Sequence, residues 1–307
     1  MRARLGRDRL VGRRWPWWIN FGNTVTVICM DAATDGTGSR FVEVGGLRVH
    51  YKRAGGGPTL LLLHGSGSSL DTFDPIAERL APRADVLRLD LPGFGLTGPR
   101  PDRDYRISTT TGTVRRTLEE LGISHAVVAG NSLGGNIAWN LALDAPTLVD
   151  ALVLINATGY PGKKPPLVMR LARSRVGRAV IRLSSGRAAV ERNLRTSVGP
   201  GSRDAVTPAL VDRVHAMLNQ PGNREAFIDF ARTTQLDRSA LIPKITAPTL
   251  VISSHGMDGQ HFARDLPQAI ELVHPTGGHL LPDEDPDWVA SAIERFLDSL
   301  DLKDGSR

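Results

Sequence analysis

Residues 130–135 read Gly-Asn-Ser-Leu-Gly-Gly, and the fold prediction starts from this motif. It lies between an apolar run at 126–129, typical of a buried strand, and a helical pattern at 136–143. A serine hydroxyl is a weak nucleophile unless it is exposed beside a base, and a tight turn flanked by glycines lifts it clear of a sheet. The pattern therefore makes Ser132 a candidate nucleophile. A turn in which the serine only caps the helix is the alternative interpretation.

Two further segments supply partners for a nucleophilic serine. An apolar strand at 60–63 continues into His-Gly-Ser-Gly at 64–67, a loop that can direct backbone N–H groups at a developing oxyanion. A Gly-Gly-His sequence ends at His279, after a short strand at 270–273. Because the ordinary pKa of histidine is about 6.5, His279 can accept and return a proton near neutral pH. His279 is therefore the candidate base.

With the serine first and the histidine last, the expected carboxylate falls between them, in the loop after an apolar strand at 249–252. That loop, at 253–259, reads Ser-Ser-His-Gly-Met-Asp-Gly, and Asp258 is its only carboxylate. Its expected role is to hold the imidazole in the correct tautomer. An Asp-Gly turn residue is the alternative interpretation. Asp265 is the nearest rival, but it falls in a helical pattern.

Together these motifs resemble the α/β-hydrolase superfamily over roughly residues 40–300. Three other segments support the likeness: Asp-Leu-Pro-Gly-Phe-Gly at 90–95, Ala-Pro-Thr-Leu-Val-Ile at 247–252, and Asp-Pro at 285–286. The resemblance implies Ser132 as nucleophile, His279 as base and Asp258 as acid. This chain departs from the family pattern in one respect. Relatives usually carry Gly-x-x-Asp directly after the strand at 249–252 and a longer helix before the histidine. In some relatives the acid follows the strand after the elbow helix, where this chain has Asn156.

The resemblance also implies an oxyanion hole formed by the backbone N–H groups of Leu133 and Ser66. The pocket is expected to take its walls from the loops around the serine and from apolar residues of an inserted segment: His64, Gly65, Gly67, Asn131, Leu167, Met169 and Phe227. We interpret His64 as a structural residue of its loop. The remaining histidines lack the spacing of a metal site, and we expect no metal and no cofactor.

The expected fold is a mostly parallel central sheet flanked by helices, with a helical cap inserted after the sixth strand. The predicted parts are a poorly ordered extension at 1–40, core at 41–157, cap at 158–242 and core at 243–307. Continuous apolar runs, typical of parallel strands buried on both faces, occur at 60–63, 85–89, 127–129, 152–155 and 249–252. The cap is predicted as short helices broken at Gly186, Pro200, Pro208 and Pro221.

The net charge of +6 is unevenly distributed. Residues 1–14 carry +5 and residues 157–204 carry +9, which leaves the remainder at −8. Residues 165–184 form a basic amphipathic pattern, for which we favour a cap helix with its arginines in water over a membrane-surface helix. One or two of these arginines facing the pocket would attract an acidic substrate. Nucleic-acid binding is not expected, because no binding motif accompanies the charge.

Hydrolysis of carboxylic esters of small to medium apolar substrates, through an acyl-enzyme, is the first functional hypothesis. The elbow also resembles carbon-carbon hydrolases that act on dienoate ring-cleavage products, but Leu-Leu-Pro follows His279 where that group usually has tryptophan. A non-catalytic ligand-binding protein is the third hypothesis. The oligomeric state is open. We expect a cytoplasmic protein, since Cys29 is the only cysteine. Residues 1–29 are expected to be disordered or to precede the true start.

Overall fold

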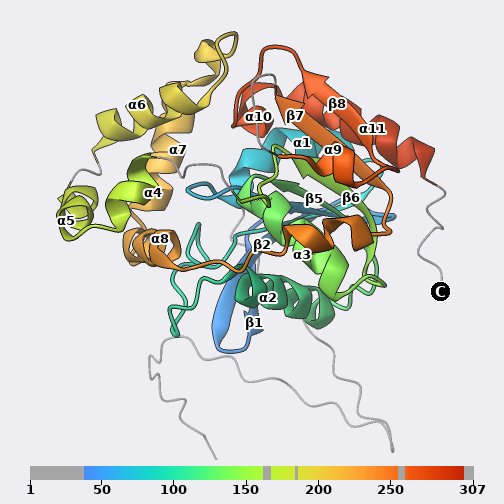
Figure 1. Cartoon of the computed structure of the whole chain (residues 1–307), viewed down its shortest axis with the longest axis horizontal. Coiled ribbons are helices and arrows are strands. Elements are labelled where there is room, and N and C mark those ends of the chain that lie inside the picture. Colours follow the sequence, from blue (N-terminus) through green and yellow to red (C-terminus); the bar gives the residue numbers. More distant parts are fainter. Residues whose placement is uncertain (1–37, 162–166, 184–185, 255–259, 301–307) are drawn as a thin grey trace, which may run out of the picture. The chain divides into compact units, whose positions relative to one another are not determined.

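A central sheet of eight strands organises the computed structural model, which describes residues 38–161, 167–183, 186–254 and 260–300 (Figure 1). Of the extension predicted at 1–40, residues 1–37 lie outside these residues, and β1 begins at Arg40. The strand order is β1-β2-β4-β3-β5-β6-β7-β8; β1 with β2 and β2 with β4 pair antiparallel, and all later pairs are parallel. The strands are β1 Arg40–Val44, β2 Leu47–Ala54, β3 Thr59–Leu63, β4 Asp85–Leu89, β5 Ala126–Asn131, β6 Val149–Ile155, β7 Thr249–Ser254 and β8 Ile270–His274. This is the mostly parallel sheet that the apolar runs predicted.

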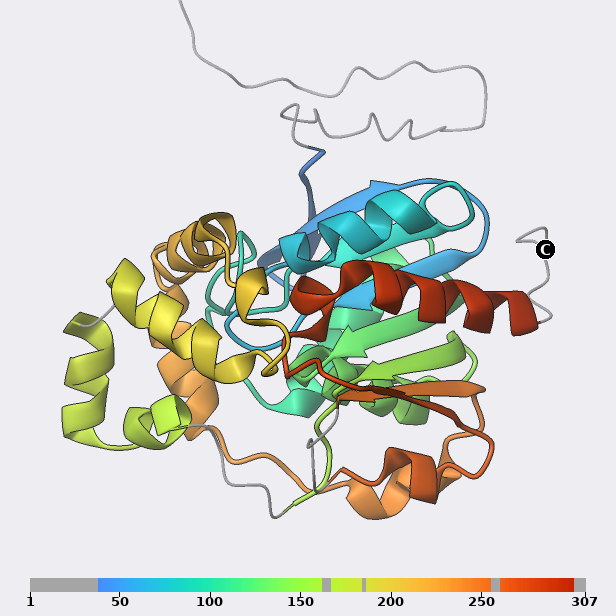
Figure 2. The ribbon, with the colours of Figure 1, turned by 90° about the horizontal axis from the view of Figure 1, so that it is seen from above.

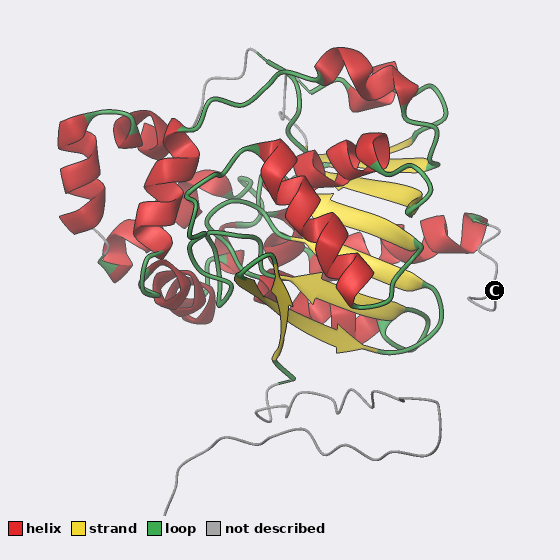
Figure 3. Cartoon of the chain, turned by 90° about the horizontal axis from the view of Figure 1, so that it is seen from below, coloured by secondary structure: helices red, strands yellow, loops and turns green. Residues whose placement is uncertain are grey.

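Helices cover both faces of this sheet. On one face α1 (Asp74–Leu80) packs beside α11 (Pro286–Ser299), as Figure 2 shows. On the other face α2 (Ile107–Glu120) packs beside α3 (Leu133–Asp144), and Figure 3 shows this side covered by helices as well. Successive residues of β3 point to opposite faces, so Leu60 and Leu62 join one apolar core while Leu61 and Leu63 join the other. Burial on both faces explains why β3 is continuously apolar from Leu60 to Leu63.

A helical insertion, α4 to α8, follows β6 and lies at one side of the sheet in both Figures 1 and 2. Its helices are α4 Leu167–Ala172, α5 Arg175–Leu183, α6 Arg187–Ser197, α7 Pro208–Leu218 and α8 Asn223–Arg232. The four predicted helix breaks, at Gly186, Pro200, Pro208 and Pro221, all fall between these helices or at their ends. Short elements complete the described chain: η1 Leu70–Phe73, η2 Arg203–Ala205, η3 Ser239–Lys244, α9 Phe262–Asp265 and α10 Leu281–Glu284.

The basic amphipathic pattern at 165–184 was predicted as one helix, and this prediction is wrong. The chain forms α4 and α5, separated at Arg173 and Ser174. The hydroxyl of Ser174 donates to the carbonyl of Leu171 at 3.1 Å and accepts from the N–H of Gly177 at 2.9 Å. A serine that bonds to nearby backbone groups competes with the helical hydrogen bonds, which explains the break. Within the described residues, no helix combines the length and the hydropathy that a membrane crossing requires.

Candidate active site

Ser132 occupies a sharp turn between β5 and α3. Its φ of +52° and ψ of −108° are unusual for a residue with a side chain, so the turn is held by its surroundings. A Cβ on Gly134 would lie 2.0 Å from the carbonyl oxygen of Leu63, and one on Gly130 would lie 2.3 Å from the backbone of Gly134. Only glycine fits at these positions, because Gly134 packs directly on β3 and Gly130 packs directly on the first turn of α3. The helix begins at Leu133 rather than near 136, since the low helix propensity of glycine concealed its first turn.

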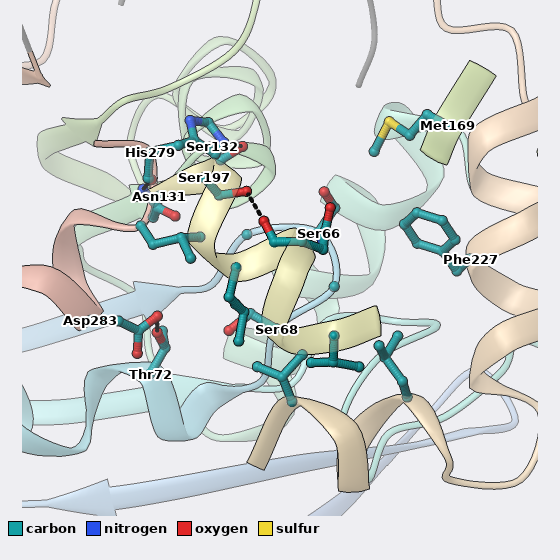
Figure 4. Close-up of a pocket in the computed structure, with 18 of the residues that line it drawn as sticks. Ser66, Ser68, Thr72, Asn131, Ser132, Met169, Ser197, Phe227, His279 and Asp283 are labelled. Atoms are coloured by element: carbon teal, nitrogen blue, oxygen red, sulfur yellow. Dashed lines mark hydrogen bonds between the residues drawn. The ribbon is translucent and has the colours of Figure 1, made fainter. Parts of the chain in front are cut away.

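The structure brings Ser132 and His279 together from positions 147 residues apart. His279 Nε2 lies 2.8 Å from Ser132 Oγ, which is hydrogen-bond distance, and Figure 4 shows the two side chains side by side. His279 lies in the loop between β8 and α10, at the edge of the sheet where the parallel strands end. A base within reach of a serine hydroxyl can remove its proton during nucleophilic attack.

The backbone of the histidine loop is held by side chains from the ends of three neighbouring strands. Asn156 Nδ2 donates to the carbonyl of Gly278 at 2.9 Å, and Ser254 Oγ donates to the same oxygen at 2.6 Å. Asn131 Nδ2 donates to the carbonyl of His279 at 3.3 Å. Sequence reasoning assigned no such role to Asn156 or Ser254. In the sequence, the signal that could have indicated these roles is that each residue is polar and lies at the carboxyl end of an apolar strand.

Asp258, the predicted acid, lies outside the described residues. Ser254, the last residue of β7, donates a hydrogen bond to the carbonyl of Gly278 in the histidine loop. The rival Asp265 lies in α9, where it pairs with Arg264 and accepts a 2.9 Å hydrogen bond from the hydroxyl of Tyr160. Arg264, and then Tyr160, lower the pKa of Asp265 to about 2. Asp265 is therefore engaged by partners other than the histidine.

An elongated pocket of about 370 Å³ opens beside Ser132 (Figure 4). Its polar side is formed by Ser66, Ser68, Thr72, Asn131, Ser132 and His279, among others. Its apolar side comes mainly from the helical insertion: Met169, Ile181, Val190, Leu194, Val214, Leu218 and Phe227. In Figure 4 Met169 and Phe227 lie across the pocket from Ser132. This arrangement suits an apolar group whose reactive carbonyl lies at the serine.

The predicted pocket residues fall into three groups. Gly65, Gly67, Asn131, Met169 and Phe227 line the pocket. The side chain of Leu167 is outside the described residues, and His64 is not among the lining residues. Of the proposed oxyanion donors, Ser66 lines the pocket, and Leu133 is the first residue of α3, where backbone N–H groups have no intrahelical acceptor.

The charged lining residues differ from those expected. Among the described residues, no arginine of α4 or α5 lines the pocket, whereas Arg224 of α8 does. Asp283 also lines it, accepting a 2.6 Å hydrogen bond from the hydroxyl of Thr72 and pairing with Arg213 of α7. Burial raises the pKa of Asp283, although Arg213 opposes the shift. The Arg213–Asp283 pair joins the insertion to the core.

Comparison with known proteins identifies the family. The sequence profile described as "alpha/beta hydrolase fold" matches residues 58–286. The chain belongs to the α/β-hydrolase fold family. An uncharacterized protein of Mycobacterium tuberculosis is 30% identical over 281 residues, which cover 85% of this chain and 81% of that protein. The N-formylmaleamate deformylase of Pseudomonas putida is 28% identical over 272 residues, covering 84% of this chain and 95% of the relative.

Among solved structures, a bacterial membrane phospholipase A superposes with a TM-score of 0.70 at 27% identity, covering 85% of each chain. The family and these relatives support hydrolysis as the reaction class of the protein. They differ in the bond that their names describe, so family membership does not identify the bond that this α/β-hydrolase cleaves.

In this α/β-hydrolase, His64 lies behind the loop that carries Ser66. Its ring is fully buried: Nδ1 donates to the carbonyl of Gly65 at 2.8 Å, and Nε2 accepts from the N–H of Leu91 at 3.0 Å. The proton thus sits on Nδ1 of a neutral ring. Burial lowers the pKa of His64, despite the nearby Asp90. The structure agrees with the structural interpretation of His64 and not with its placement in the pocket wall.

The buried neutral ring of His64 predicts a loss of stability in mild acid. Below the ordinary pKa of about 6.5 the unfolded chain binds a proton that folded His64 excludes, so the free energy of unfolding falls as pH decreases. Between pH 6.5 and 5.5 wild type should lose up to about 1 kcal/mol more than His64→Gln, since the unfolded histidine is already half protonated at pH 6.5. Urea unfolding at both pH values measures this difference. The exposed His125→Gln serves as control, and equal losses in wild type and His64→Gln would contradict the prediction.

Proposed function

We propose that this hydrolase cleaves carboxylic esters of small to medium apolar groups through an acyl-enzyme on Ser132. The observation that carries the proposal is the 2.8 Å contact between His279 Nε2 and Ser132 Oγ at the wall of a largely apolar pocket. The phospholipase A relative, an ester hydrolase by its name, supports the choice of an ester bond. The pocket of about 370 Å³ suits an acyl chain of short to medium length.

In the proposed reaction, His279 removes the hydroxyl proton of Ser132 as Oγ attacks the ester carbonyl. The N–H groups of Leu133 and Ser66 stabilise the negative oxygen of the tetrahedral intermediate. Asp258 orients the imidazole and stabilises its protonated form. The imidazolium then protonates the departing alcohol, which leaves an acyl group on Ser132. Water activated by the same histidine attacks this group and releases the acid.

A p-nitrophenyl ester series from acetate to decanoate, assayed beside a dienoate ring-cleavage product, tests the type of bond that is cleaved. We expect turnover of the esters, with the highest kcat/KM at short to medium chain length. Turnover of the dienoate alone would replace the ester proposal by carbon-carbon hydrolysis. Absence of both activities, together with failure of a fluorophosphonate to label Ser132, would favour a non-catalytic ligand-binding protein.

A second candidate is hydrolysis of an acyl compound that carries a carboxylate, and Arg224 is the observation that favours it. Arg224 and Phe227 are three residues apart on α8, so they share a helix face, and both line the pocket. Arg224 also donates to the side-chain oxygen of Asn219. A guanidinium binds carboxylates with two parallel hydrogen bonds. The deformylase relative is named for a maleamate, which is itself a carboxylate.

Replacement of Arg224 by glutamine tests this candidate. We expect the ratio of kcat/KM for a mono-p-nitrophenyl glutarate to kcat/KM for p-nitrophenyl butyrate to fall about 10-fold or more, because a hydrogen bond to a charged group contributes about 1.5–3 kcal/mol. Steady-state kinetics of the two esters give the ratio. Arg232→Gln, an exposed change on the same helix, is the matched control. An unchanged ratio in Arg224→Gln would exclude Arg224 as a carboxylate-binding residue.

A further inference from the structure

Two backbone segments from distant parts of the chain touch each other beside His279. The N–H of His279 donates to the carbonyl of Ser197, the last residue of α6, at 2.9 Å. A Cβ on Gly278 would lie 2.2 Å from the nitrogen of Gly199, and one on Gly199 would lie 2.1 Å from the carbonyl oxygen of Thr276. Neither glycine can carry a side chain unless the two segments separate. The end of α6 and the histidine loop are therefore fitted together backbone to backbone.

The carboxylate of Glu284, at the end of α10, joins these same segments. Its Oε2 accepts from the N–H of Gly278 at 2.7 Å and from the N–H of Gly199 at 2.9 Å. Its Oε1 accepts from the N–H of Leu280 at 2.9 Å. One side chain thus binds the residues on both sides of His279 and the segment that follows α6. Hydrogen bonds to a charged acceptor are roughly twice as strong as neutral ones, which makes this carboxylate a firm junction.

The junction connects the base to the pocket wall. Helix α6 contributes Asn193, Leu194 and Ser197 to the pocket lining, and His279 lines the same pocket. Displacement of α6 therefore acts on the histidine loop through Ser197 and through Glu284.

We propose that Glu284 is a positioning residue that fixes His279 against Ser132 and couples the position of this base to α6. The proposal rests on the proposed catalytic roles of Ser132 and His279. It explains why a carboxylate that does not touch the reacting atoms accepts three backbone N–H groups around the histidine. A role for Glu284 was not predicted from the sequence.

Replacement of Glu284 by glutamine tests the coupling with little change in size. The amide turns an N–H₂ group toward N–H donors, so at least one of the three hydrogen bonds is lost. We expect kcat/KM for p-nitrophenyl butyrate to fall about 10- to 100-fold, mainly through kcat, because small displacements of catalytic groups have effects of this size. Labelling of Ser132 by a fluorophosphonate should slow in proportion. KM for the same ester should change by less than about twofold, because Glu284 is not among the residues that line the pocket.

A second pair of variants separates positioning from folding. Gly199→Ala forces the two segments apart and leaves Glu284 in place, whereas Gly186→Ala adds a methyl group where no atom lies within 4 Å. We expect Gly199→Ala to lower kcat and the labelling rate as Glu284→Gln does, and Gly186→Ala to resemble wild type. Asp287→Asn, which removes an exposed carboxylate three residues away, is the control for charge. If Glu284→Gln does not fold, Gly199→Ala decides the test.

Two results would overturn the proposal. One is a folded Glu284→Gln variant whose kcat/KM stays within about twofold of wild type. If Glu284→Gln does not fold, the same result for a folded Gly199→Ala variant has this meaning. The other is a Glu284→Gln variant in which KM rises while kcat stays at the wild-type value, since that pattern indicates an altered pocket and not a displaced base. Turnover by Ser132→Ala, or wild type that no fluorophosphonate labels, would instead contradict the proposed function. An inactive Ser132→Ala beside a normal Glu284→Gln contradicts the positioning role alone.

Discussion

Ser132→Ala is expected to lower kcat for p-nitrophenyl esters by about 10⁴- to 10⁶-fold, which is the range for loss of a serine nucleophile. Alanine has no oxygen to attack the carbonyl, and His279 Nε2 loses the hydroxyl that lies 2.8 Å away. Since the change removes one buried atom from the turn, the melting temperature should stay within a few degrees of the wild-type value. Initial rates at saturating ester, with circular dichroism melting of the same samples, measure both quantities.

Ser291→Ala is the matched control for this experiment, because Ser291 lies on α11 and its hydroxyl donates only to the carbonyl of Asp287 among the described contacts. It should retain the wild-type kcat. Residual turnover of Ser132→Ala above about 1% of wild type, far more than the expected range allows, would place the nucleophile elsewhere. Mass spectrometry of fluorophosphonate-treated wild type would then identify the labelled residue.

Asp258→Asn should produce the second largest loss, about 10⁴-fold in kcat, because an amide holds the imidazole in the wrong tautomer and does not stabilise its positive charge. Ser254, at the end of β7 and four residues before Asp258 in the sequence, contacts the carbonyl of Gly278 in the histidine loop. Steady-state kinetics with the best p-nitrophenyl ester, supported by a melting curve, give the comparison with wild type.

Asp265→Asn provides the control for the acid. Its carboxylate is bound by Arg264 and Tyr160, so its replacement should leave kcat within a few-fold of wild type and act mainly on stability. The opposite ranking, with Asp265→Asn inactive and Asp258→Asn active, would transfer the acid role to Asp265 and require α9 to move.

Much of the fold could be predicted because its local patterns agree with the tertiary structure. The continuous apolar run at 60–63 indicates a strand buried on both faces, and β3 is such a strand. The turn at Ser132 could be located because its glycines have a steric reason to be there. The break between α4 and α5 could not be predicted from periodicity, since it depends on the hydrogen bonds of the Ser174 hydroxyl.

The parts of the site that sequence reasoning missed depend on contacts between distant segments. Asn156 was considered only as a residue that lacks a carboxylate, yet its amide holds the carbonyl of Gly278. Glu284 follows His279 by five residues, but the importance of its position depends on Gly199, 85 residues earlier. Arg224 could not be distinguished from other arginines, because side-chain direction in the insertion depends on how α8 packs. Contacts between residues far apart in the chain produce no periodic pattern and no local change of composition in a single sequence.

The backbone of Ser132 sets an upper limit on how stable an active form of this enzyme can be. A residue with a side chain in a sparsely populated region of φ and ψ costs of order 1–3 kcal/mol, and glycine at the same position is nearly free of that cost. Selection for thermal tolerance alone would therefore favour glycine at 132, which removes the nucleophile. In an evolution experiment, the most heat-resistant descendants of this sequence should include ones that have lost the proposed reaction.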